Sequence, residues 1–326
     1  MSRYGYRVCS ACFTDEPRDH FSSAQWAKGG GRSRCVACVA GNVQASDDNN
    51  PSARTGSGAT SAQIMGERAF AHGGQRHAFH AVYLDGERKG SAAVAKAFIQ
   101  RGRIEDKAFV DDREVVRWAL RFVTQFNGGG AGASAVAALG GPLRLNVPEA
   151  FYLADGTLWR GSGRAGARRY LVEPYVHGFK KYNSNTGFVH AAGSSASSRD
   201  VSEALQALSH YSYHSSGGML VLCDLQCGTA SARGGGGLVV TDPVIMSRFK
   251  GKYGPTDLGS EGIVTFFSQH NCGRFCDARW TRPKNSRYAV LPVVAGTSNT
   301  AHSYAPAARG PGLGGIAEDD EDDWDD

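Results

Sequence analysis

The chain has 326 residues, of which 41% are hydrophobic and 21% are charged. This balance is typical of a folded protein with a sizeable core, and it excludes a chain that is disordered or coiled coil throughout. No stretch approaches the roughly 20 consecutive apolar residues of a membrane helix, and the N-terminus MSRYGYRVCSACF has no apolar signal core. We therefore expect a soluble intracellular protein, cytoplasmic or nuclear, with no membrane partner.

The formal net charge of +5 combines two opposed regions. Residues 318–326 carry eight acids and no base, so the rest of the chain has a net charge of +13. A basic body of this kind favours phosphate-bearing partners, such as a nucleotide or a nucleic acid, or an acidic protein. Residues 296–326 are rich in Gly, Ala and Pro before they become acidic, and we expect them to form a disordered tail.

The first 40 residues contain two CxxC pairs, Cys9 with Cys12 and Cys35 with Cys38. Two such pairs can supply the four thiolates of a tetrahedral zinc site. Because so short a segment has little core of its own, the metal would supply its folding energy. The spacing thus predicts a zinc module over residues 1–40, and its segment HFSSAQWAKGGGRSRC is similar to small zinc modules of adaptor type. Both a structural clip and a docking site for a protein or nucleic acid fit this pattern.

Residues 41–63 hold almost no large apolar side chain and predict a flexible linker. Beyond them, strands and helices recur to about residue 294, in an order typical of a two-lobed α+β fold rather than a doubly wound sheet. We expect a low-complexity loop with at most one short helical turn at 128–141, and a polar hairpin loop at GSGRAG (161–166), which matches GxGxxG but opens no helix. The predicted strands are 77–84, 92–99, 149–155, 169–176 and 219–226, and a helix is expected to start near Asp200. A further helix is predicted at 111–127, with Asp111 and Glu114 as its capping box and an apolar face formed by Val115, Trp118, Phe122 and Phe126.

A second metal pattern lies near the end of this region. His270, Cys272 and Cys276 form HxCxxxC, which supplies three ligands of the kinds that zinc prefers. A structural zinc site needs a fourth ligand, and a histidine brought in by the fold would provide it. His210 and His214 are the two candidates.

Several segments of the middle region together resemble the alpha-kinases, atypical protein kinases that include myosin heavy chain kinase, elongation factor 2 kinase and the kinase domain fused to certain TRP channels. The resemblance covers about residues 64–290 in the family's order. It implies a kinase domain at 64–295, with an N-lobe that is mainly antiparallel sheet with one helix and a mixed C-lobe stabilised by zinc. The segments are FAHGGQRHAFHA (70–81), VEPYVHGFKKYNSNTGFV (172–189), ALSHYSYHSSGGMLVLCDLQ (207–226), VVTDP (239–243) and YGPTDLGSEGIVTFFSQHNCGRFC (253–276).

The resemblance implies that the domain binds ATP. Lys96 is the lone lysine in the apolar run VAKAF and needs an anion, which the resemblance identifies as the α- and β-phosphates. Glu114, on the predicted helix, could pair with Lys96 as well as cap the helix. The other residues placed at the nucleotide are Gly73, Gly74 and Arg76 near the phosphates, Glu173 and Tyr175 at the hinge beside adenine, and Lys181.

The catalytic chemistry falls on the two acids that follow apolar strands. The resemblance makes Asp224 the catalytic aspartate, which accepts or orients the proton of the substrate hydroxyl. Gln226 and Asp242 would be the Mg²⁺ ligands, since both offer oxygen atoms. Gln226 lies two residues beyond Asp224 and would share its face of an extended strand. For the zinc site, the resemblance favours His210 as the fourth ligand.

These patterns predict an ATP-dependent protein serine/threonine kinase of alpha type with Mg²⁺ and Zn²⁺ as metals. The alternative is a catalytically weak pseudokinase scaffold with a zinc docking module. Two departures from the family pattern motivate it: Asp257 replaces the usual asparagine, and the stretch between Asp224 and Asp242 is longer than usual. A zinc-dependent nucleic-acid binder is a third reading.

Overall fold

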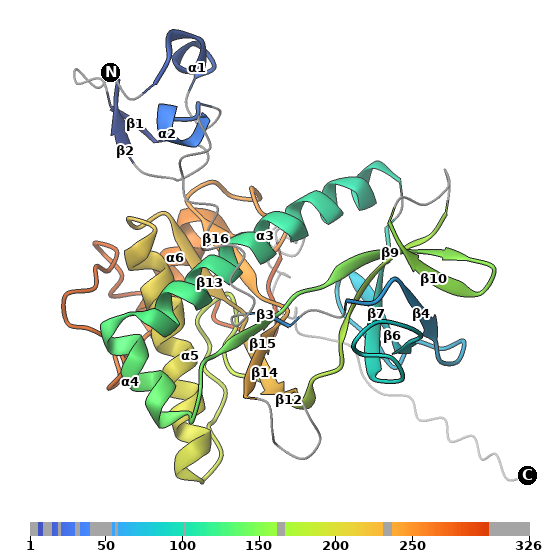
Figure 1. Ribbon diagram of the computed structural model, residues 1–326. Helices are drawn as coiled ribbons and strands as arrows, with labels where there is room; N and C mark the ends of the chain where they lie inside the picture. Colours follow the sequence, from blue (N-terminus) through green and yellow to red (C-terminus); the bar gives the residue numbers. More distant parts are fainter. Residues whose placement is uncertain are drawn as a thin grey trace, which may run out of the picture.

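The computed structural model in Figure 1 describes residues 6–8, 15–18, 21–29, 33–39, 54–55, 58–100, 102–161, 167–230 and 237–299. Most of the predicted linker, most of the GSGRAG loop and most of the predicted tail therefore lie outside the described residues.

The larger sheet has seven antiparallel strands in the order β4-β10-β9-β11-β7-β6-β5, and β4 also pairs with β6. The sheet therefore closes on itself. Side chains that alternate along its strands, such as Tyr83, Ala95, Phe151 and Val172, fill its interior. The strands are β4 (Ser61–Ile64), β5 (Ala71–His72), β6 (Arg76–Tyr83), β7 (Ala92–Phe98), β9 (Glu149–Ala154), β10 (Thr157–Arg160) and β11 (Arg169–Pro174).

A five-stranded sheet, in the order β12-β14-β15-β8-β3, and an antiparallel pair β13–β16 form the second region, with helices α4, α5 and α6 (Figure 1). The long helix α3 runs between the two regions in this view. The strands are β3 (Arg54–Thr55), β8 (Arg144–Asn146), β12 (His177–Lys181), β13 (Leu220–Cys223), β14 (Gln226–Thr229), β15 (Leu238–Thr241) and β16 (Val244–Ser247). The helices are α3 (Arg103–Gly128), α4 (Gly130–Ala138), α5 (Ala196–Ser215) and α6 (Gly259–Gln269).

Helix α3 confirms the predicted apolar face but not the predicted start. Trp118, Phe122 and Phe126 are buried in the core shared with α5. The helix begins at Arg103, so the proposed capping box is wrong: Asp111 lies inside the helix and pairs with Lys107. The earlier start follows from Glu105 and Asp106, which place negative charge in the first turn, where the helix dipole favours it.

The loop predicted at 128–141 is wrong, because the segment contains helix α4. Its alanines have the highest helix propensity, and the glycines around them concealed that signal. One glycine has a packing role, since a Cβ added to Gly132 would lie 1.7 Å from the carbonyl oxygen of Phe126. Gly132 thus lets α4 pack against the end of α3.

The predicted strand at 219–226 is in fact two strands. Strand β13 ends at Cys223 and β14 begins at Gln226, and Asp224 between them has a φ of 58°. A left-handed residue interrupts the alternation of an extended strand. Asp224 and Gln226 therefore do not share one strand face. The other predicted strands correspond to β6, β7, β9 and β11, and the helix near Asp200 to α5.

The N-terminal part contains the antiparallel strands β1 (Tyr6–Val8) and β2 (Asp15–Pro17) and the helices α1 (Ser23–Ala27) and α2 (Val36–Val39). Phe21 is buried and packs edge-on against Trp26, whose ring also lies under the guanidinium of Arg18. Cys35 is buried. Cys9, Cys12 and the side chain of Cys38 lie outside the described residues, so the predicted zinc module stays a prediction.

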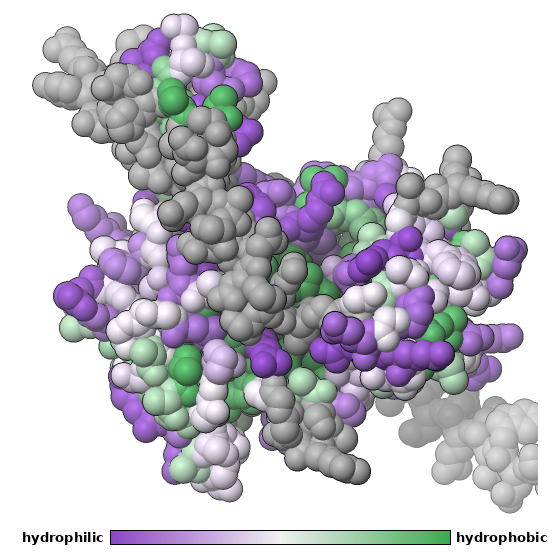
Figure 2. All heavy atoms as spheres, in the orientation of Figure 1, coloured by the Kyte–Doolittle hydropathy of each residue, from purple (hydrophilic) through white to green (hydrophobic). Residues whose placement is uncertain are grey.

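No described helix combines the length and the apolar composition needed to cross a bilayer. On the face drawn in Figure 2, hydrophilic residues are spread widely and apolar residues form small separate patches.

Candidate active site

A cavity of about 410 Å³ lies between the closed sheet, helix α3 and the second region. Every part of the fold that surrounds it contributes polar side chains. Its charged and amide-bearing lining residues are Gln75, Arg76, Lys96, Asp111, Asp112, Lys181, Asp224, Gln226, Asp242 and Asn299. Of the predicted nucleotide and metal residues, Gly73 and Gly74 also line it, whereas Glu173 and Tyr175 do not.

Lys96 lies at the centre of a buried charge cluster. Its Nζ is 2.5 Å from Glu173 Oε1 and 2.5 Å from Asp242 Oδ1, and its side chain is 11% exposed. Strand pairing explains the contact with Glu173: Lys96 on β7 faces Leu171 on β11, so Glu173 is its diagonal neighbour. Lys96 thus joins the closed sheet to the acid that follows β15.

The carboxyl partner of Lys96 was not predicted from the sequence. Glu114, offered as a partner, instead pairs with Arg117, with an Nη–Oε distance of 2.8 Å, and both side chains are largely exposed. The signal available in the sequence was Glu173 itself, an acid inside the apolar run YLVEPYV. A buried acid needs a cation, and Lys96 is the cation that the neighbouring strand presents.

The two residues predicted at the hinge, Glu173 and Tyr175, make different contacts. Glu173 is buried and uses its side chain on Lys96. The backbone N–H of Tyr175 donates to the carbonyl of Ala92 at 3.1 Å, and its ring lies against His177. The structure therefore does not bring Tyr175 to the cavity.

Asp224 forms a second polar cluster in the cavity lining. Its Oδ1 is 2.7 Å from Lys181 Nζ, and its Oδ2 accepts a 2.7 Å hydrogen bond from the hydroxyl of Thr297. Lys181 Nζ also donates to that hydroxyl at 2.9 Å. A carboxylate, an ammonium group and a hydroxyl thus meet at one point in the cavity wall.

A hairpin holds the two acids near each other. Strands β14 and β15 are antiparallel, with Gln226 facing Thr241, so Asp224 and Asp242 lie at the same end of the hairpin. Both acids have positive φ angles, 58° and 50°. Residues 231–236 of the long connection lie outside the described residues. The described residues on either side of them pair from Gln226–Thr241, beside the acids, to Thr229–Leu238.

The charge states follow from burial and from these pairs. Burial raises the pKa of Asp242, but Lys96 and Arg76 outweigh it and leave that pKa below its ordinary value. Burial also raises the pKa of Asp224, and Lys181 offsets this only in part. Asp242 is therefore held as an anion, whereas Asp224 has a higher proton affinity than an exposed aspartate.

Arg76 closes the side of the cavity beside the glycine turn. Its Nη2 pairs with Asp112 on α3, its guanidinium lies 4.7 Å from the centre of the Phe98 ring, and its buried Nε has no hydrogen-bond partner among the described residues. The turn at Gly73 is closed by a 2.8 Å hydrogen bond from its N–H to the carbonyl of Arg76. A buried donor without a partner among the described residues, on a side chain that lines a cavity, suits an anionic ligand.

Asp257 lies outside the cavity and serves the loop before α6. Its carboxylate accepts hydrogen bonds from the backbone and the hydroxyl of Ser247, at 2.8 Å each, and from the backbone of Tyr253 and Gly259. The side chain is fully buried. Asp257 therefore uses its oxygens to connect the end of β16 to the loop before α6, and it does not line the cavity.

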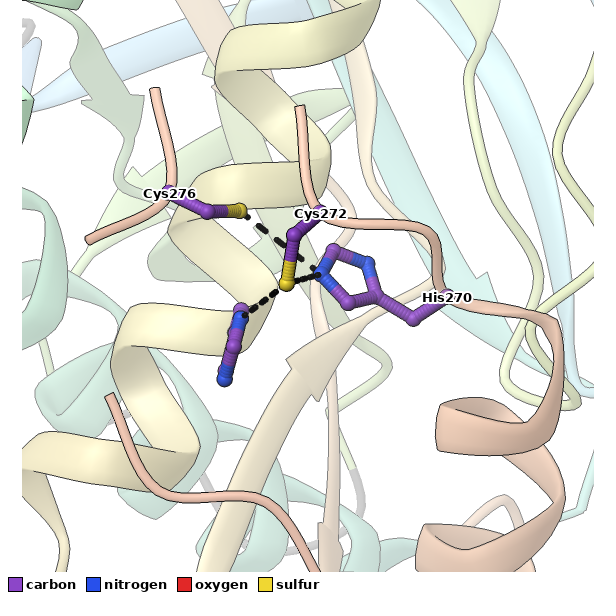
Figure 3. Close-up of side chains that lie close together, drawn as sticks. His270, Cys272 and Cys276 are labelled. Carbon is purple, nitrogen blue, oxygen red and sulfur yellow. Dashed lines mark hydrogen bonds between the residues drawn. The ribbon is translucent and has the colours of Figure 1, made fainter. Parts of the chain in front are cut away.

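The predicted zinc ligands meet in one cluster beside α5 and α6. The nearest ligand atoms of His210, His270, Cys272 and Cys276 all lie within 4.8 Å of one another. In Figure 3 the sulfurs of Cys272 and Cys276 point toward the Nε2 of His270, at 3.8 and 3.7 Å. His210 Nδ1 is 3.6 Å from Cys272 Sγ. The rival His214 is not part of this group and lies near Thr281.

The donor set fits a tetrahedral zinc ion. With zinc–sulfur and zinc–nitrogen bonds of 2.3 and 2.0–2.1 Å, neighbouring ligand atoms should lie about 3.3–3.8 Å apart. Burial lowers the pKa of His210 to about 4 and that of His270 to about 3, so both imidazoles are neutral at pH 7 and have a free lone pair. The Nε2 of His210 is 3.1 Å from the Thr281 carbonyl, which orients Nδ1 toward the cluster.

The tail predicted to start at residue 296 is ordered at its beginning. Residues 294–299 contact Asn185, Thr186 and His190, and Thr297 and Asn299 line the cavity. A composition rich in small residues suggested disorder, but the backbone here is fixed by side chains from residues 185–190. Polar residues of the cavity lining that no sequence pattern indicated include Gln75, Asp112, Thr297 and Asn299.

Comparison with known proteins agrees with this geometry. The family model of the alpha-kinase family matches residues 71–276, well over half of the chain. Alpha-protein kinase 1 of Dictyostelium discoideum is 30% identical over 209 residues, which is 64% of this chain and 13% of that protein. Human eukaryotic elongation factor 2 kinase is 34% identical over 123 residues, which is 37% of this chain and 15% of that protein. The chain thus spans less than a fifth of these two relatives.

A solved structure shares the fold. The alpha kinase from Entamoeba histolytica has a TM-score of 0.51 and 23% sequence identity, over 73% of this chain and 84% of that one. The segment that the family model matches, residues 71–276, contains the residues predicted at the nucleotide, Mg²⁺ and catalytic positions and the second predicted zinc set, but not the cysteines of the predicted N-terminal zinc module. The chain belongs to the alpha-kinase family.

Proposed function

We propose that this protein transfers the γ-phosphoryl group of Mg-ATP to a serine or threonine hydroxyl of a protein substrate. The observation that carries the proposal is the convergence of Lys96, Asp224 and Asp242 on one cavity from three separate parts of the chain. Phosphoryl transfer depends mainly on positioned positive charge and an oriented acceptor. The cavity lining offers both.

The nucleotide would bind on the wall formed by the closed sheet. Lys96 is anchored by two carboxylates, so its ammonium group has a fixed position for the α- and β-phosphates. The unpartnered Nε of Arg76 and the backbone of the Gly73–Gly74 turn lie at the same side of the cavity. A solved structure of the myosin heavy chain kinase A domain contains ATP, and in this cavity Arg76, Lys96 and Lys181 are the cations that could meet the phosphates.

Gln226 and Asp242 would hold Mg²⁺. Both line the cavity, both present oxygen atoms, and Asp242 is kept ionised by its cationic neighbours. The ion supplies charge neutralisation at the phosphates when it is bound. The protein's own part is to keep these two oxygens at the base of one hairpin.

Asp224 would receive the proton of the acceptor hydroxyl. Its burial strengthens its affinity for a proton, and Lys181 beside it stabilises negative charge. We also propose that His210, His270, Cys272 and Cys276 bind a structural zinc ion. A Cys2His2 set has no open coordination position, so this ion would stabilise the fold around α5 and α6 rather than take part in transfer.

The test is incorporation of radiolabel from γ-labelled ATP with Mg²⁺ into an added basic protein, followed by phosphoamino-acid analysis. We expect phosphoserine or phosphothreonine. Label on tyrosine alone would contradict the proposed acceptor class. Nucleotide-dependent thermal stabilisation without any transfer would instead support a pseudokinase scaffold.

A further inference from the structure

The last described segment enters the cavity beside the proposed catalytic aspartate. The hydroxyl of Thr297 donates to Asp224 Oδ2 at 2.7 Å and accepts from Lys181 Nζ at 2.9 Å. Under the proposed function, Asp224 faces the hydroxyl that accepts the phosphoryl group. A threonine of the same chain therefore already occupies the acceptor position.

The segment is held through its backbone, as a bound peptide would be. The N–H and the carbonyl of Val294 both bond to the hydroxyl of Thr186, at 3.0 and 3.1 Å. The side-chain amide of Asn185 accepts from the N–H of Ser298 at 2.9 Å and donates to its carbonyl at 2.7 Å. These contacts flank Thr297 on both sides and do not depend on the side chains of Val294 and Ser298.

Asn185 and Thr186 together form a clamp that holds residues 294–298. Hydrogen bonds of the same turn connect this clamp to Asp224. Asn185 and Thr186 are fully buried in the turn after β12, and Gly187 in that turn has a φ of 82°. Two residues earlier, the side-chain oxygen of Asn183 accepts a 2.8 Å hydrogen bond from the N–H of Leu225, next to Asp224. The position of the clamp relative to the catalytic carboxylate is therefore fixed by buried hydrogen bonds.

Resting on the proposed function, we propose that residues 294–299 are an intramolecular acceptor segment and that Thr297 is phosphorylated by its own active site. The Thr297 oxygen forms a bond to the γ-phosphorus of ATP as the bond to the β,γ-bridging oxygen breaks. The hydroxyl proton passes to Asp224, and ADP leaves. Atoms and charge balance without any further reactant.

The product cannot keep this position. A phosphothreonine carries a charge of about −1.5 to −2 at pH 7 and would lie against the carboxylate of Asp224. Lys181 alone balances one charge. Repulsion would expel the segment and leave the acceptor position open for a protein substrate, so unmodified Thr297 and the substrate compete for one site.

The test uses the full chain with labelled Mg-ATP and no added substrate. We expect phosphate on Thr297 by mass spectrometry of the peptides, with a first-order rate constant that does not change over a twenty-fold range of protein concentration. Thr297→Ala should lose this phosphate, and Thr297→Ser should retain it as phosphoserine. Ser298→Ala is the matched control, since only the backbone of Ser298 contacts Asn185, and it should leave the modification of Thr297 intact.

Three outcomes would overturn the inference. If an added basic protein is phosphorylated while Thr297 stays unmodified, the acceptor segment is wrong and the proposed function stands. If the rate constant rises in proportion to protein concentration, the reaction occurs between molecules and the intramolecular assignment fails. If neither the basic protein nor Thr297 gains phosphate, the proposed function fails together with the inference.

Discussion

Replacing Lys96 by methionine removes the cation from a buried charge cluster. Methionine has similar length and volume, so the change acts mainly on charge. It leaves Glu173, whose side chain is 5% exposed, and Asp242, at 29% exposed, without their shared partner. Removing one member of a buried ion pair costs about 3–5 kcal/mol. For a domain of this size, that corresponds to a fall in Tm of roughly 6–20 °C.

The matched control is Lys107→Met. Lys107 also pairs with an aspartate, Asp111, but its side chain is 64% exposed. An exposed pair contributes at most about 1 kcal/mol, so this variant should unfold within a few degrees of the wild type. Thermal unfolding at pH 7.5, followed by circular dichroism, compares the two variants directly.

The pH dependence of the deficit provides a second check. Burial raises the pKa of Glu173, and Lys96 opposes this, so the variant should raise that pKa further. If folding raises the pKa of a carboxyl group, the group destabilises the folded state at any pH where it is ionised in the unfolded chain. For a glutamate this means above about pH 4.3, and at lower pH the destabilisation disappears. The deficit of Lys96→Met should therefore shrink between pH 8 and pH 5, and adding Glu173→Gln should restore part of the stability. Equal losses for Lys96→Met and Lys107→Met at pH 7.5 would refute this reasoning.

Three further predictions concern packing, proton affinity and metal. Gly132→Ala should destabilise the fold by about 1–3 kcal/mol, because its Cβ would overlap the carbonyl of Phe126. Gly130→Ala, in the same helix with open space around it, should instead gain up to about 1 kcal/mol in the same denaturation assay. Because the pKa of Asp224 is raised, kcat/KM should begin to fall, as the pH is lowered, at a pH above the ordinary aspartate pKa of about 3.9. A profile that stays flat down to pH 4 would contradict this prediction. Cys272→Ser should lose one bound zinc ion by atomic absorption and at least about 3 kcal/mol, or roughly 6–12 °C in Tm; unchanged metal content would exclude this zinc site.

The parts of the fold that depend on local periodicity could be predicted from the sequence. Alternation placed strands β6 and β7 around a polar turn, and the spacing of Trp118, Phe122 and Phe126 identified the buried face of α3. The helix start could not be placed, because acids at 105–106 and at 111–114 are equally compatible with a first turn. Glycines at 128–132 hid α4, since their packing role appears only when α3 is present.

The site was predictable where a residue's chemistry conflicts with its surroundings. Lys96 in an apolar strand and His270 with two cysteines at metal-ligand spacing are such cases, and the structure brings both into clusters. Contacts between distant segments left no such mark. Thr297 looks like any residue of a polar, small-residue stretch, and only the folded chain places it 2.7 Å from Asp224.

The most direct test of the account separates nucleotide binding from transfer in Asp224→Asn. The control is Asp155→Asn, because Asp155 is an exposed aspartate that also has a positive φ, 49° against 58°, which asparagine tolerates equally well. We expect Asp224→Asn to bind Mg-ATP within about threefold of the wild type, since the side-chain partners of Asp224 are Lys181 and Thr297 rather than Lys96. Loss of a general base should slow single-turnover transfer by about 10²–10⁴-fold, with no change for Asp155→Asn. Transfer by Asp224→Asn at the wild-type rate would contradict the claim that this carboxylate faces the acceptor hydroxyl.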